Sequence, residues 1–416
     1  MGRSNETHQL AIIGAGPAGL AAASAAAQLD PVLFELGPSI GDRRQTDRFT
    51  SIHGVGGAGL FSDGKFSFWP SASRLWDLDP ELLTSAYEAI RNALSWAMPT
   101  FPSMPALGGS TPSIMGDVKR YESLYSSPVQ RREITETLAK RSRSLFANTS
   151  IDSATHDGRV WRLQTSNGNE VLAETLLLAG GRFSAITLQR WLPSSCFTYR
   201  RLEVGVRIEQ PRNSFFLRGM PELDPKYIFS DSAKELQWRT FCCCRDGVVV
   251  ETESLGLLTV SGRADCAPTG RSNVGFNTRF LRRNDAQAEW PGLIERVRLA
   301  ERSVSEDFSC FVNGGDGPLR ELFGPRISDA LIDGLRRLTM SFDGEDLAAA
   351  SLVGPAIEGT MMYPIHRSDL SVVGAQGAAW VAGDAAGDFR GLTAALVSGH
   401  VAGLSILRWV KERLHK

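Results

Sequence analysis

One stretch close to the N-terminus decides the fold: Ala11-Ile12-Ile13-Gly14-Ala15-Gly16-Pro17-Ala18-Gly19-Leu20. Apolar residues typical of a buried strand run into a Gly-x-Gly-x-x-Gly turn, and small residues that favour a helix follow. Gly14 permits the tight turn, Gly16 lets the backbone approach a phosphate, and Gly19 allows close helix–strand packing. The helix N-terminus adds N–H donors and a positive dipole end. The stretch therefore predicts a binding site for a dinucleotide pyrophosphate.

A second predicted strand ends in an acidic residue. The run Pro31-Val32-Leu33-Phe34-Glu35 places a carboxylate about 16 residues after Gly19, near the spacing of about 20 expected for an acceptor of the ribose hydroxyl groups. Glu35 is our predicted ribose ligand.

The far end of the chain indicates which nucleotide is bound. A strand that closes on a Gly-Asp pair is predicted at Ala378-Ala379-Trp380-Val381-Ala382-Gly383-Asp384, and a long helix from about Gly391 to Arg408 follows. This arrangement resembles the second FAD fingerprint of glutathione-reductase-like flavoproteins, in which the matching Asp holds the ribityl chain and the next helix N-terminus faces the flavin pyrimidine. NAD-only Rossmann domains lack it. The resemblance implies bound FAD, with Asp384 on the ribityl chain.

A third match lies between these two. The run Glu174-Thr175-Leu176-Leu177-Leu178-Ala179-Gly180-Gly181 is similar to the strand that ends in Ala-Thr-Gly in those flavoproteins, with Gly180 in place of Thr. Before it, residues 160–165 and 170–173 have strand character, and Asn167-Gly168 is a two-residue turn signal. We therefore expect a hairpin that leads into a buried strand.

The resemblance becomes narrower at Gly54-Val55-Gly56-Gly57-Ala58-Gly59-Leu60-Phe61-Ser62-Asp63-Gly64-Lys65. This block is similar to the Gly-Gly-Ala-Gly-x-Phe-Ser-Asp-Gly-Lys signature of a family of FAD-dependent dehydrogenases that is largely uncharacterised. Shorter matches to the family follow at residues 204–209, 240–244, 354–358 and 383–392. The family usually carries one or two cysteines where this chain has three, and often Gly where it has Ala385, so the substrate stays open.

Glycines in such a block suit a backbone that passes close to a planar ring, because missing side chains expose N–H groups and permit positive φ. Together the matches imply an FAD site. Its predicted residues are Gly14, Gly16, Pro17, Ala18, Gly19, Glu35, Leu36, Gly57, Ala58, Gly59, Ser62, Gly180, Gly383, Asp384, Gly391, Leu392 and Thr393.

Four side chains are candidates for catalysis. Lys65 would stabilise negative charge on a reduced flavin or an anionic substrate, and the alternative is a surface lysine after a turn. Arg390 would bind a substrate carboxylate, and the alternative is a structural donor. Tyr363 and His366 precede the Gly-Asp strand, where either would serve as an acid or base.

Composition excludes several classes of partner. The chain has 45 basic and 46 acidic residues, so no global field favours nucleic acid or an anionic membrane. Its six cysteines contain no Cys-x-x-Cys pair, so we expect neither a zinc cage nor a thioredoxin-like dithiol, no metal, and a reducing cytoplasm. We interpret Cys242, Cys243 and Cys244 as small apolar residues of a strand, with the first and third on one side.

Two apolar stretches resemble targeting or membrane segments. Residues 11–27 follow little positive charge, unlike a secretory signal, and their glycine spacing has a specific use. Residues 392–410 are near membrane-spanning length but include Ser398, His400 and Arg408. We expect a nucleotide-binding turn in the first case, a buried helix in the second, and no membrane association.

The fingerprints of one nucleotide domain are scattered along 416 residues, so other segments must be inserted. We predict an α/β protein with a glutathione-reductase-like FAD-binding Rossmann domain, built on a mostly parallel three-layer sheet. This domain comprises residues 1–69, 145–196 and 350–416, with a helical insertion at 70–144 and an inserted α+β substrate domain at 197–349.

The resemblance implies an FAD-dependent dehydrogenase or oxidase that transfers hydride between a small organic substrate and flavin N5. Asn313-Gly314-Gly315-Asp316-Gly317 lacks a preceding strand, so we expect a loop there and no dedicated NADPH domain. Electrons would come from the substrate, from transiently bound NAD(P)H or from a redox partner. Two alternatives stay open: a single-component flavin monooxygenase that uses NAD(P)H and oxygen, and a non-enzymatic FAD-bound regulatory protein.

Overall fold

The structure is a computed structural model that describes residues 7–106, 114–115, 118–212, 214, 222–341 and 349–414. The chain divides into two compact units. Unit 1 comprises residues 1–109, 124–198 and 362–416, and unit 2 comprises residues 110–123 and 199–361. Each unit is therefore discontinuous in sequence.

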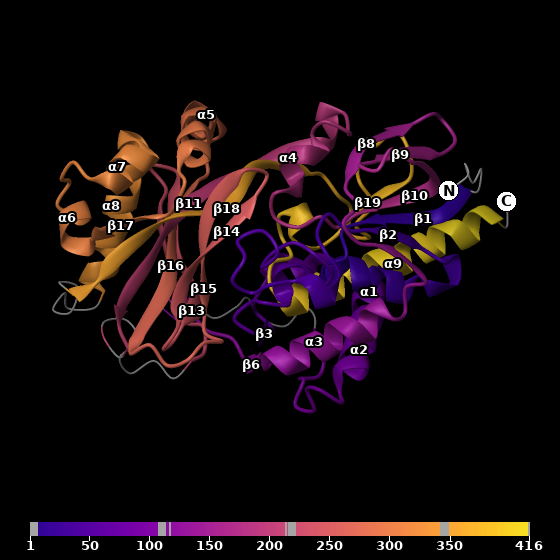
Figure 1. The fold of residues 1–416 in the computed structure, drawn as a ribbon, viewed down its shortest axis with the longest axis horizontal. Helices are drawn as coiled ribbons and strands as arrows, with labels where there is room; N and C mark the ends of the chain where they lie inside the picture. The colour runs from indigo at the N-terminus through magenta and orange to yellow at the C-terminus, as the bar shows by residue number, and fades with distance from the viewer. Residues whose placement is uncertain are drawn as a thin grey trace. The chain divides into compact units, whose positions relative to one another are not determined.

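The centre of unit 1 is a mostly parallel sheet (Figure 1). Its parallel strands lie in the order β7 (Ser144–Phe146), β2 (Val32–Phe34), β1 (Thr7–Ile13), β10 (Glu170–Leu178) and β19 (Ala379–Val381). An antiparallel pair, β8 (Ile151–His156) and β9 (Trp161–Thr165), extends from the first half of β10. In β2 and β19 every residue is buried, as expected for parallel strands that are covered on both faces. The predicted Rossmann-like α/β architecture is confirmed at this level.

Helices from both ends of the chain pack against each other in unit 1. Figure 1 shows α9 (Leu392–Leu414, yellow) alongside α1 (Pro17–Ala25, indigo). A Cβ atom on Gly399 would lie 2.0 Å from the Ala18 carbonyl oxygen, so the two backbones are in contact. α9 is long and apolar enough to cross a membrane, yet 67% of its apolar window is buried within the protein. The prediction of a buried helix agrees with this packing.

Segments that we expected as a separate helical insertion also pack in unit 1. α2 (Pro80–Leu94) buries one face and lies against α9, and Arg408 of α9 forms an ion pair with Glu81 at 3.1 Å. α3 (Pro128–Ala139) begins with a capping box formed by Ser127 and Gln130 and packs near α1. Residues 70–106 and 124–144 thus belong to unit 1, because the apolar faces of α2 and α3 are covered there. The shorter elements of unit 1 are β3 (Lys65–Ser67), β6 (Ser123–Tyr125) and α4 (Ser184–Leu188).

The predicted hairpin is present, but its turn differs from the expected two-residue one. Thr165 accepts a hydrogen bond from the Gly168 amide and donates its own amide to Asn169, so three residues form the loop. Gly168 has φ +81°, which places the glycine in the left-handed position that follows the turn. A three-residue loop of this kind needs positive φ at its last residue, and glycine satisfies that need.

Unit 2 is built on an eight-stranded sheet. The order is β17 (Val304–Asp307), β18 (Ser351–Pro364), β11 (Phe197–Pro211), β16 (Arg271–Phe280), β13 (Leu236–Cys244), β12 (Lys226–Asp231), β5 (Val118–Lys119) and β4 (Ile114–Met115). β14 (Val248–Ser254) and β15 (Leu257–Arg263) form a separate ribbon. The helices are α5 (Arg283–Leu299), α6 (Phe308–Val312), α7 (Pro318–Phe323) and α8 (Pro325–Met340). Residues 313–317 are the predicted loop between α6 and α7.

Candidate functional site

The fingerprint turn has the geometry that its glycines predict. Gly14 has φ +103°, and a Cβ atom there would lie 2.5 Å from the carbonyl oxygen of Ala179. A Cβ atom on Gly19 would lie 1.9 Å from the Gly14 carbonyl oxygen. Both positions require glycine, because real Cβ contacts are never this short. The turn therefore lies tightly between α1 and the end of β10, next to the predicted Gly180.

The other glycine segments meet this turn. A Cβ atom on Gly57 would lie 2.9 Å from the Cα atom of Gly16, so two side-chain-free backbones touch. On Gly59 it would lie 2.7 Å from Leu392, and on Gly383 it would lie 2.9 Å from Ala18. Residues more than 300 positions apart in the sequence thus converge in unit 1. The structure brings together the N-terminal turn, the 54–65 block and the start of α9.

Glu35 connects these segments through hydrogen bonds. Its carboxylate is buried and accepts the amide of Ala15 at 2.9 Å, of Gly37 at 3.0 Å and of Gly54 at 2.9 Å. Two of these bonds end on Oε1 and one on Oε2. A carboxylate offers about four acceptor positions, so Oε2 retains capacity for one more donor. Glu35 therefore holds two loops together, in addition to being the predicted ribose ligand.

Two buried arginines hold the glycine block, and sequence reasoning missed both. Arg43 donates to the carbonyl oxygens of Thr50, Ser51 and Val55 at 2.9–3.0 Å. Burial lowers the pKa of Arg43 to about 10, while the charge of Glu35 acts in the opposite direction. Arg131 of α3 donates to the carbonyl oxygen of Leu60 at 3.1 Å. Neither residue is part of a local motif, so only the tertiary structure reveals them.

The Gly-Asp pair is linked to the arginine that precedes α9. Arg390 donates to both carboxylate oxygens of Asp384, from Nε at 3.0 Å and from Nη2 at 3.1 Å. Arg182 lies 3.7 Å from the same carboxylate. This pairing agrees with Arg390 as a structural donor, which holds Asp384 in a fixed orientation.

The start of α9 carries polar groups that no residue of the described chain satisfies. Thr393 is 2% exposed, and its Oγ1 has no hydrogen-bond partner among the residues that the structure describes. A Cβ atom on Gly391, at φ +99°, would meet nothing within 4 Å. The first N–H groups of a helix also lack partners within the helix. Space and donors are thus available together at this N-terminus.

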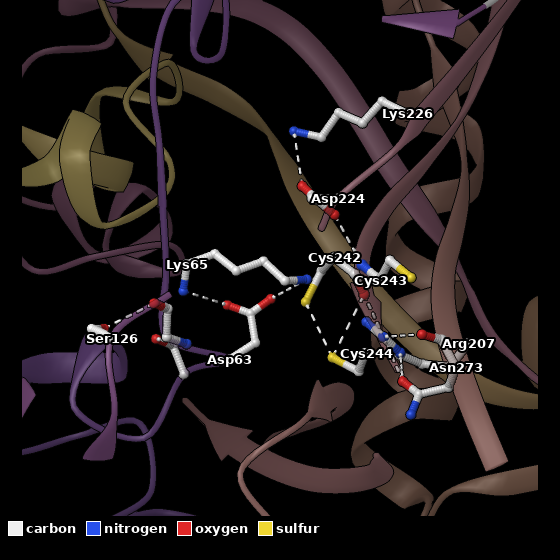
Figure 2. Close-up of polar contacts among 12 residues, drawn as sticks. Asp63, Lys65, Ser126, Arg207, Asp224, Lys226, Cys242, Cys243, Cys244 and Asn273 are labelled. Atoms are coloured by element: carbon white, nitrogen blue, oxygen red, sulfur yellow. Dashed lines mark hydrogen bonds and ion pairs between the residues drawn. The ribbon is translucent and has the colours of Figure 1, made fainter. Parts of the chain in front are cut away.

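Lys65 and Ser62 make contacts within their own turn, as Figure 2 shows for Lys65. Lys65 Nζ lies 3.1 Å from Asp63 Oδ2, and both side chains are largely buried. Ser62 Oγ donates to the Gly59 carbonyl at 2.9 Å and accepts from the Gly64 amide at 3.3 Å. Ser126 donates its amide and its hydroxyl to the Gly64 carbonyl oxygen, both at 2.8 Å. Lys65 is therefore no exposed surface lysine.

The remaining candidates differ in exposure. Tyr363 is fully buried and packs against Gly387. A Cβ atom on Gly387 would lie 2.6 Å from the tyrosine ring. His366 Nδ1 lies 3.0 Å from the carbonyl oxygen of Arg367, and its Nε2 lies 3.7 Å from Asp388 Oδ2. Leu36 is 42% exposed, and its amide is not among the contacts of Glu35.

These residues fit a dinucleotide such as FAD. The fingerprint turn and the 54–65 block meet through bare backbone, which a pyrophosphate or a planar ring can approach. The buried Thr393 Oγ1 lacks a partner among the described residues, and Glu35 keeps one acceptor position. Both are the kinds of group that a ribose or flavin edge satisfies.

Unit 2 concentrates buried charge on one sheet face. Glu203 of β11 is fully buried and pairs with Arg201 at 2.7 Å, with Arg279 at 3.2 Å and with Arg239 at 2.5 Å. Burial, followed by the charge of Arg239, lowers the pKa of Arg279 to about 9. Burial likewise lowers the pKa of Lys119 to about 8, and the charges of Lys226, Arg239 and Arg279 add to the effect.

Lys226 adds a further cation to this face. Its ammonium group lies 3.8 Å from Asp224, and burial lowers its pKa. Glu203 thus meets three arginines and Asp224 meets Lys226, while the charges of Lys226, Arg239 and Arg279 act on Lys119. Sequence reasoning missed this cluster because its members come from five different strands, β5, β11, β12, β13 and β16.

Comparison with solved structures finds matches at low sequence identity, with TM-scores below 0.5. A geranylgeranyl bacteriochlorophyll reductase-like protein from Thermoplasma acidophilum matches 98% of this chain and 80% of its own, with 13% identity and a TM-score of 0.44. A flavoprotein/dehydrogenase from Cytophaga hutchinsonii matches 97% and 79%, with 13% identity and a TM-score of 0.43. CtdE in complex with FAD matches 99% and 90%, with 13% identity and a TM-score of 0.41. No family model and no curated protein sequence matches the chain.

Proposed function

We propose that this protein is an FAD-dependent oxidoreductase of the dehydrogenase or oxidase type. The main support for this proposal is that glycine segments from residues 14–19, 57–59 and 383–391 lie next to one another in unit 1. Glu35 links two of these loops by accepting hydrogen bonds from their amides. A side-chain-free surface next to two helix N-termini suits an anionic dinucleotide. The block at residues 54–65 also resembles the signature of the dehydrogenase family.

Different residues of unit 1 would contact different parts of the cofactor. The Gly16 amide and the first N–H groups of α1 after Pro17 would hold the pyrophosphate, and Glu35 Oε2 would accept from the adenosine ribose. Asp384, fixed by Arg390, would accept from the ribityl hydroxyl groups. Thr393 and the first amides of α9 would donate to the pyrimidine edge of the ring. When bound, FAD supplies a two-electron acceptor at its N5 atom.

His366 is the side chain in unit 1 that we propose as the proton-holding group. A carbonyl oxygen only accepts, so Nδ1 donates its hydrogen to the Arg367 carbonyl oxygen and Nε2 is the ring nitrogen on the side of Asp388, 3.7 Å from Oδ2. Tyr363 is fully buried behind Gly387, which makes it a packing residue in our proposal.

The cations of unit 2 indicate the class of substrate. Lys119, Lys226, Arg239 and Arg279 lie close enough for the charges of the other cations to lower the pKa of Lys119, so this face attracts negative charge. We therefore propose a small organic substrate that carries a carboxylate or a similar anionic group, bound by unit 2. Electrons reach the flavin from this substrate, from transiently bound NAD(P)H or from a redox partner.

Absorbance of the purified protein tests the cofactor. We expect flavin bands that survive gel filtration and FAD, rather than FMN, on release by heat. Asp384→Asn removes a charge-assisted acceptor, so FAD affinity should fall about 10- to 100-fold, the equivalent of about 1.5–3 kcal/mol. Glu209→Gln, in an ion pair with Arg271 on the unit 2 sheet, is the matched control and should retain FAD. Colourless protein that takes up no FAD on reconstitution would refute the proposal.

An anaerobic screen separates the alternatives. Bleaching of the flavin by an anionic metabolite, without NAD(P)H, identifies a dehydrogenase or oxidase. NAD(P)H-dependent oxygen uptake with an oxygenated product would instead establish the monooxygenase. An FAD-loaded protein whose flavin is reduced by neither class of donor would favour the regulatory role.

A further inference from the structure

β13 of unit 2 carries three consecutive cysteines at a β-bulge. Phe241 pairs with Gly275 and Cys244 pairs with Asn273 of β16, so two residues of β13 oppose one residue of its neighbour. Cys242 has φ +47°, which is unusual for a residue with a side chain. The bulge leaves the Sγ atoms of Cys242 and Cys244 on the same side, 3.9 Å apart. Figure 2 shows the two sulfur atoms facing each other.

A buried guanidinium lies next to these thiols. Arg207 of β11 is 1% exposed and donates to Asn273 Oδ1 at 2.8 Å and to the Cys242 carbonyl oxygen at 2.6 Å. A Cβ atom on Gly262 would lie 2.2 Å from Nη2 of Arg207, so this glycine makes room for the group. Among the residues that the structure describes, no carboxylate forms an ion pair with Arg207. A buried cation of this kind requires a negative partner.

Thiols are the ionisable groups that raise the pKa of this guanidinium. Burial acts to lower the pKa of Arg207, but attraction to the sulfur atoms of Cys242 and Cys244 outweighs it, and the pKa is raised. Interactions of this type are mutual, so the guanidinium stabilises a thiolate relative to a thiol. Among the described residues of unit 2, Asp224 accepts the Cys243 amide at 2.9 Å, and Lys226 pairs with Asp224.

The two thiols also differ in access. Cys242 is partly exposed, whereas Cys244 is fully buried. Cys243 is buried as well, and its amide is bound to Asp224. Side chains two residues apart on one side of a strand have Cα atoms at roughly 6.6 Å, within the range that a disulfide spans. One exposed and one buried thiol at this separation is the arrangement of an attacking and a resolving cysteine.

We propose that Cys242 and Cys244 form a redox-active dithiol that exchanges with a small-molecule disulfide, with Arg207 as its built-in counter-charge. The Cys242 thiolate attacks one sulfur of the disulfide, the S–S bond breaks, and the first thiolate leaves with the bonding electrons. The Cys244 thiolate then attacks Cys242 Sγ and expels the second. The protons of the two cysteines go to the departing thiolates. One disulfide is reduced to two thiols while the protein dithiol is oxidised.

Glutathione disulfide is the probe for the test, and the full-length protein is the sample. Trypsin releases residues 240–245 as one peptide that contains all three cysteines. We expect this peptide to become lighter by two hydrogen atoms and to regain them with dithiothreitol. Cys243→Ala should still form the disulfide. Cys244→Ala should stop at a glutathione adduct on Cys242, and Cys242→Ala should form neither product.

Exposed Cys266 and Cys310 serve as internal controls for the reaction. If they take up glutathione while residues 242–244 stay fully reduced, the proposal is wrong. A disulfide that forms equally well in Cys242→Ala, through Cys243, would also overturn it. The reaction needs no flavin, so its result is independent of the proposed oxidoreductase function, and flavin content measured on the same sample separates the two.

Arg207 is a positioning residue in this proposal and requires its own readout. Arg207→Met should slow alkylation of Cys242 by iodoacetamide at neutral pH about tenfold, because the thiolate is the reactive form. The pH midpoint of that reaction should move upward, and Arg207→Lys should restore it in part. Circular dichroism of each variant verifies the fold. An unchanged pH profile in a folded Arg207→Met protein would show that the guanidinium is only structural.

Discussion

Unit 1 and unit 2 each contain a buried site that suits charged groups, but the two sites are built from different parts of the chain. In unit 1 the site is made of backbone: glycines at 14, 16, 19 and 57 let backbone segments approach one another closely, and Glu35 holds the loops together through three amides. In unit 2 the site is made of buried side-chain charges on a sheet face, around Glu203 and beside Arg207. A backbone site is therefore sensitive to an added methyl group, whereas a charge site is sensitive to a lost charge.

Removal of one charge from unit 2 should have the largest effect. Glu203→Gln leaves Arg201, Arg239 and Arg279 facing one another in a buried cluster. We expect a loss of about 3–5 kcal/mol in the free energy of unfolding, as for other broken buried ion pairs. Urea denaturation measures it.

The control for this prediction lies in the same strand. Glu209→Gln removes a partner of Arg271, but both of these side chains are partly exposed. Its effect should stay below about 1 kcal/mol, because solvent screens the pair. Equal losses in the two variants would contradict our view of unit 2 as a buried charge site.

An added methyl group tests unit 1 in the same way. Gly19→Ala places a Cβ atom 1.9 Å from the Gly14 carbonyl oxygen, which forces α1 away from β1. Overpacking of this kind costs about 1–3 kcal/mol, which thermal unfolding detects.

Gly16→Ala is the matched variant, because its Cβ atom would meet only the Gly57 Cα atom at an ordinary 3.7 Å. We expect this variant to lose FAD, since the methyl group occupies the surface proposed for the phosphates, and to melt at the same temperature as wild type when both are compared without FAD. Retained FAD in Gly16→Ala would show that the bare backbone at this turn is not the binding surface.

The smallest expected effect concerns pH. Burial, followed by the charge of Arg141, lowers the pKa of His400 on α9 to about 4. In the unfolded chain this pKa is about 6.5, so the unfolded state binds a proton first as the pH falls. Stability contributed by the neutral ring is present above pH 6.5 and is lost between about pH 6.5 and 4, by about 1 kcal/mol at pH 5.5.

His400→Gln removes this titration. The stability of the variant should therefore fall less between pH 7 and pH 5.5 than that of the wild type, in urea denaturation at both pH values. Identical pH dependence would mean that unit 1 does not bury a neutral histidine there. The result would sharpen the contrast with unit 2, which buries charged groups.

Local patterns explain what could be predicted. The strand–turn–helix at residues 11–25, the strand before Gly383 and the long final helix each depend on neighbours in sequence, and all are present. The hairpin was predicted, but its turn was assigned one loop residue too few, because loop length depends on how the two strands pair. The pairing of Arg390 with Asp384 lay within reach of sequence reasoning, since six residues separate them.

Long-range contacts explain what could not be predicted. Arg43 and Arg131 carry no motif, yet they hold the glycine block through carbonyl oxygens of distant residues. We placed Cys242 and Cys244 on one side of a strand as small apolar residues, but nothing in the sequence reveals the bulge or the arginine 35 positions away that lies beside Cys242.

The sequence by itself determined where the backbone can bend. It also determined which segments alternate between apolar and polar residues and which are continuously apolar, because φ preferences and side-chain periodicity are properties of a few adjacent residues. Only the tertiary structure decided which distant groups share one buried space: three amides on Glu35, three arginines on Glu203, and two thiols beside Arg207. The physical reason is that strand register and helix packing set those distances, and both depend on the whole chain.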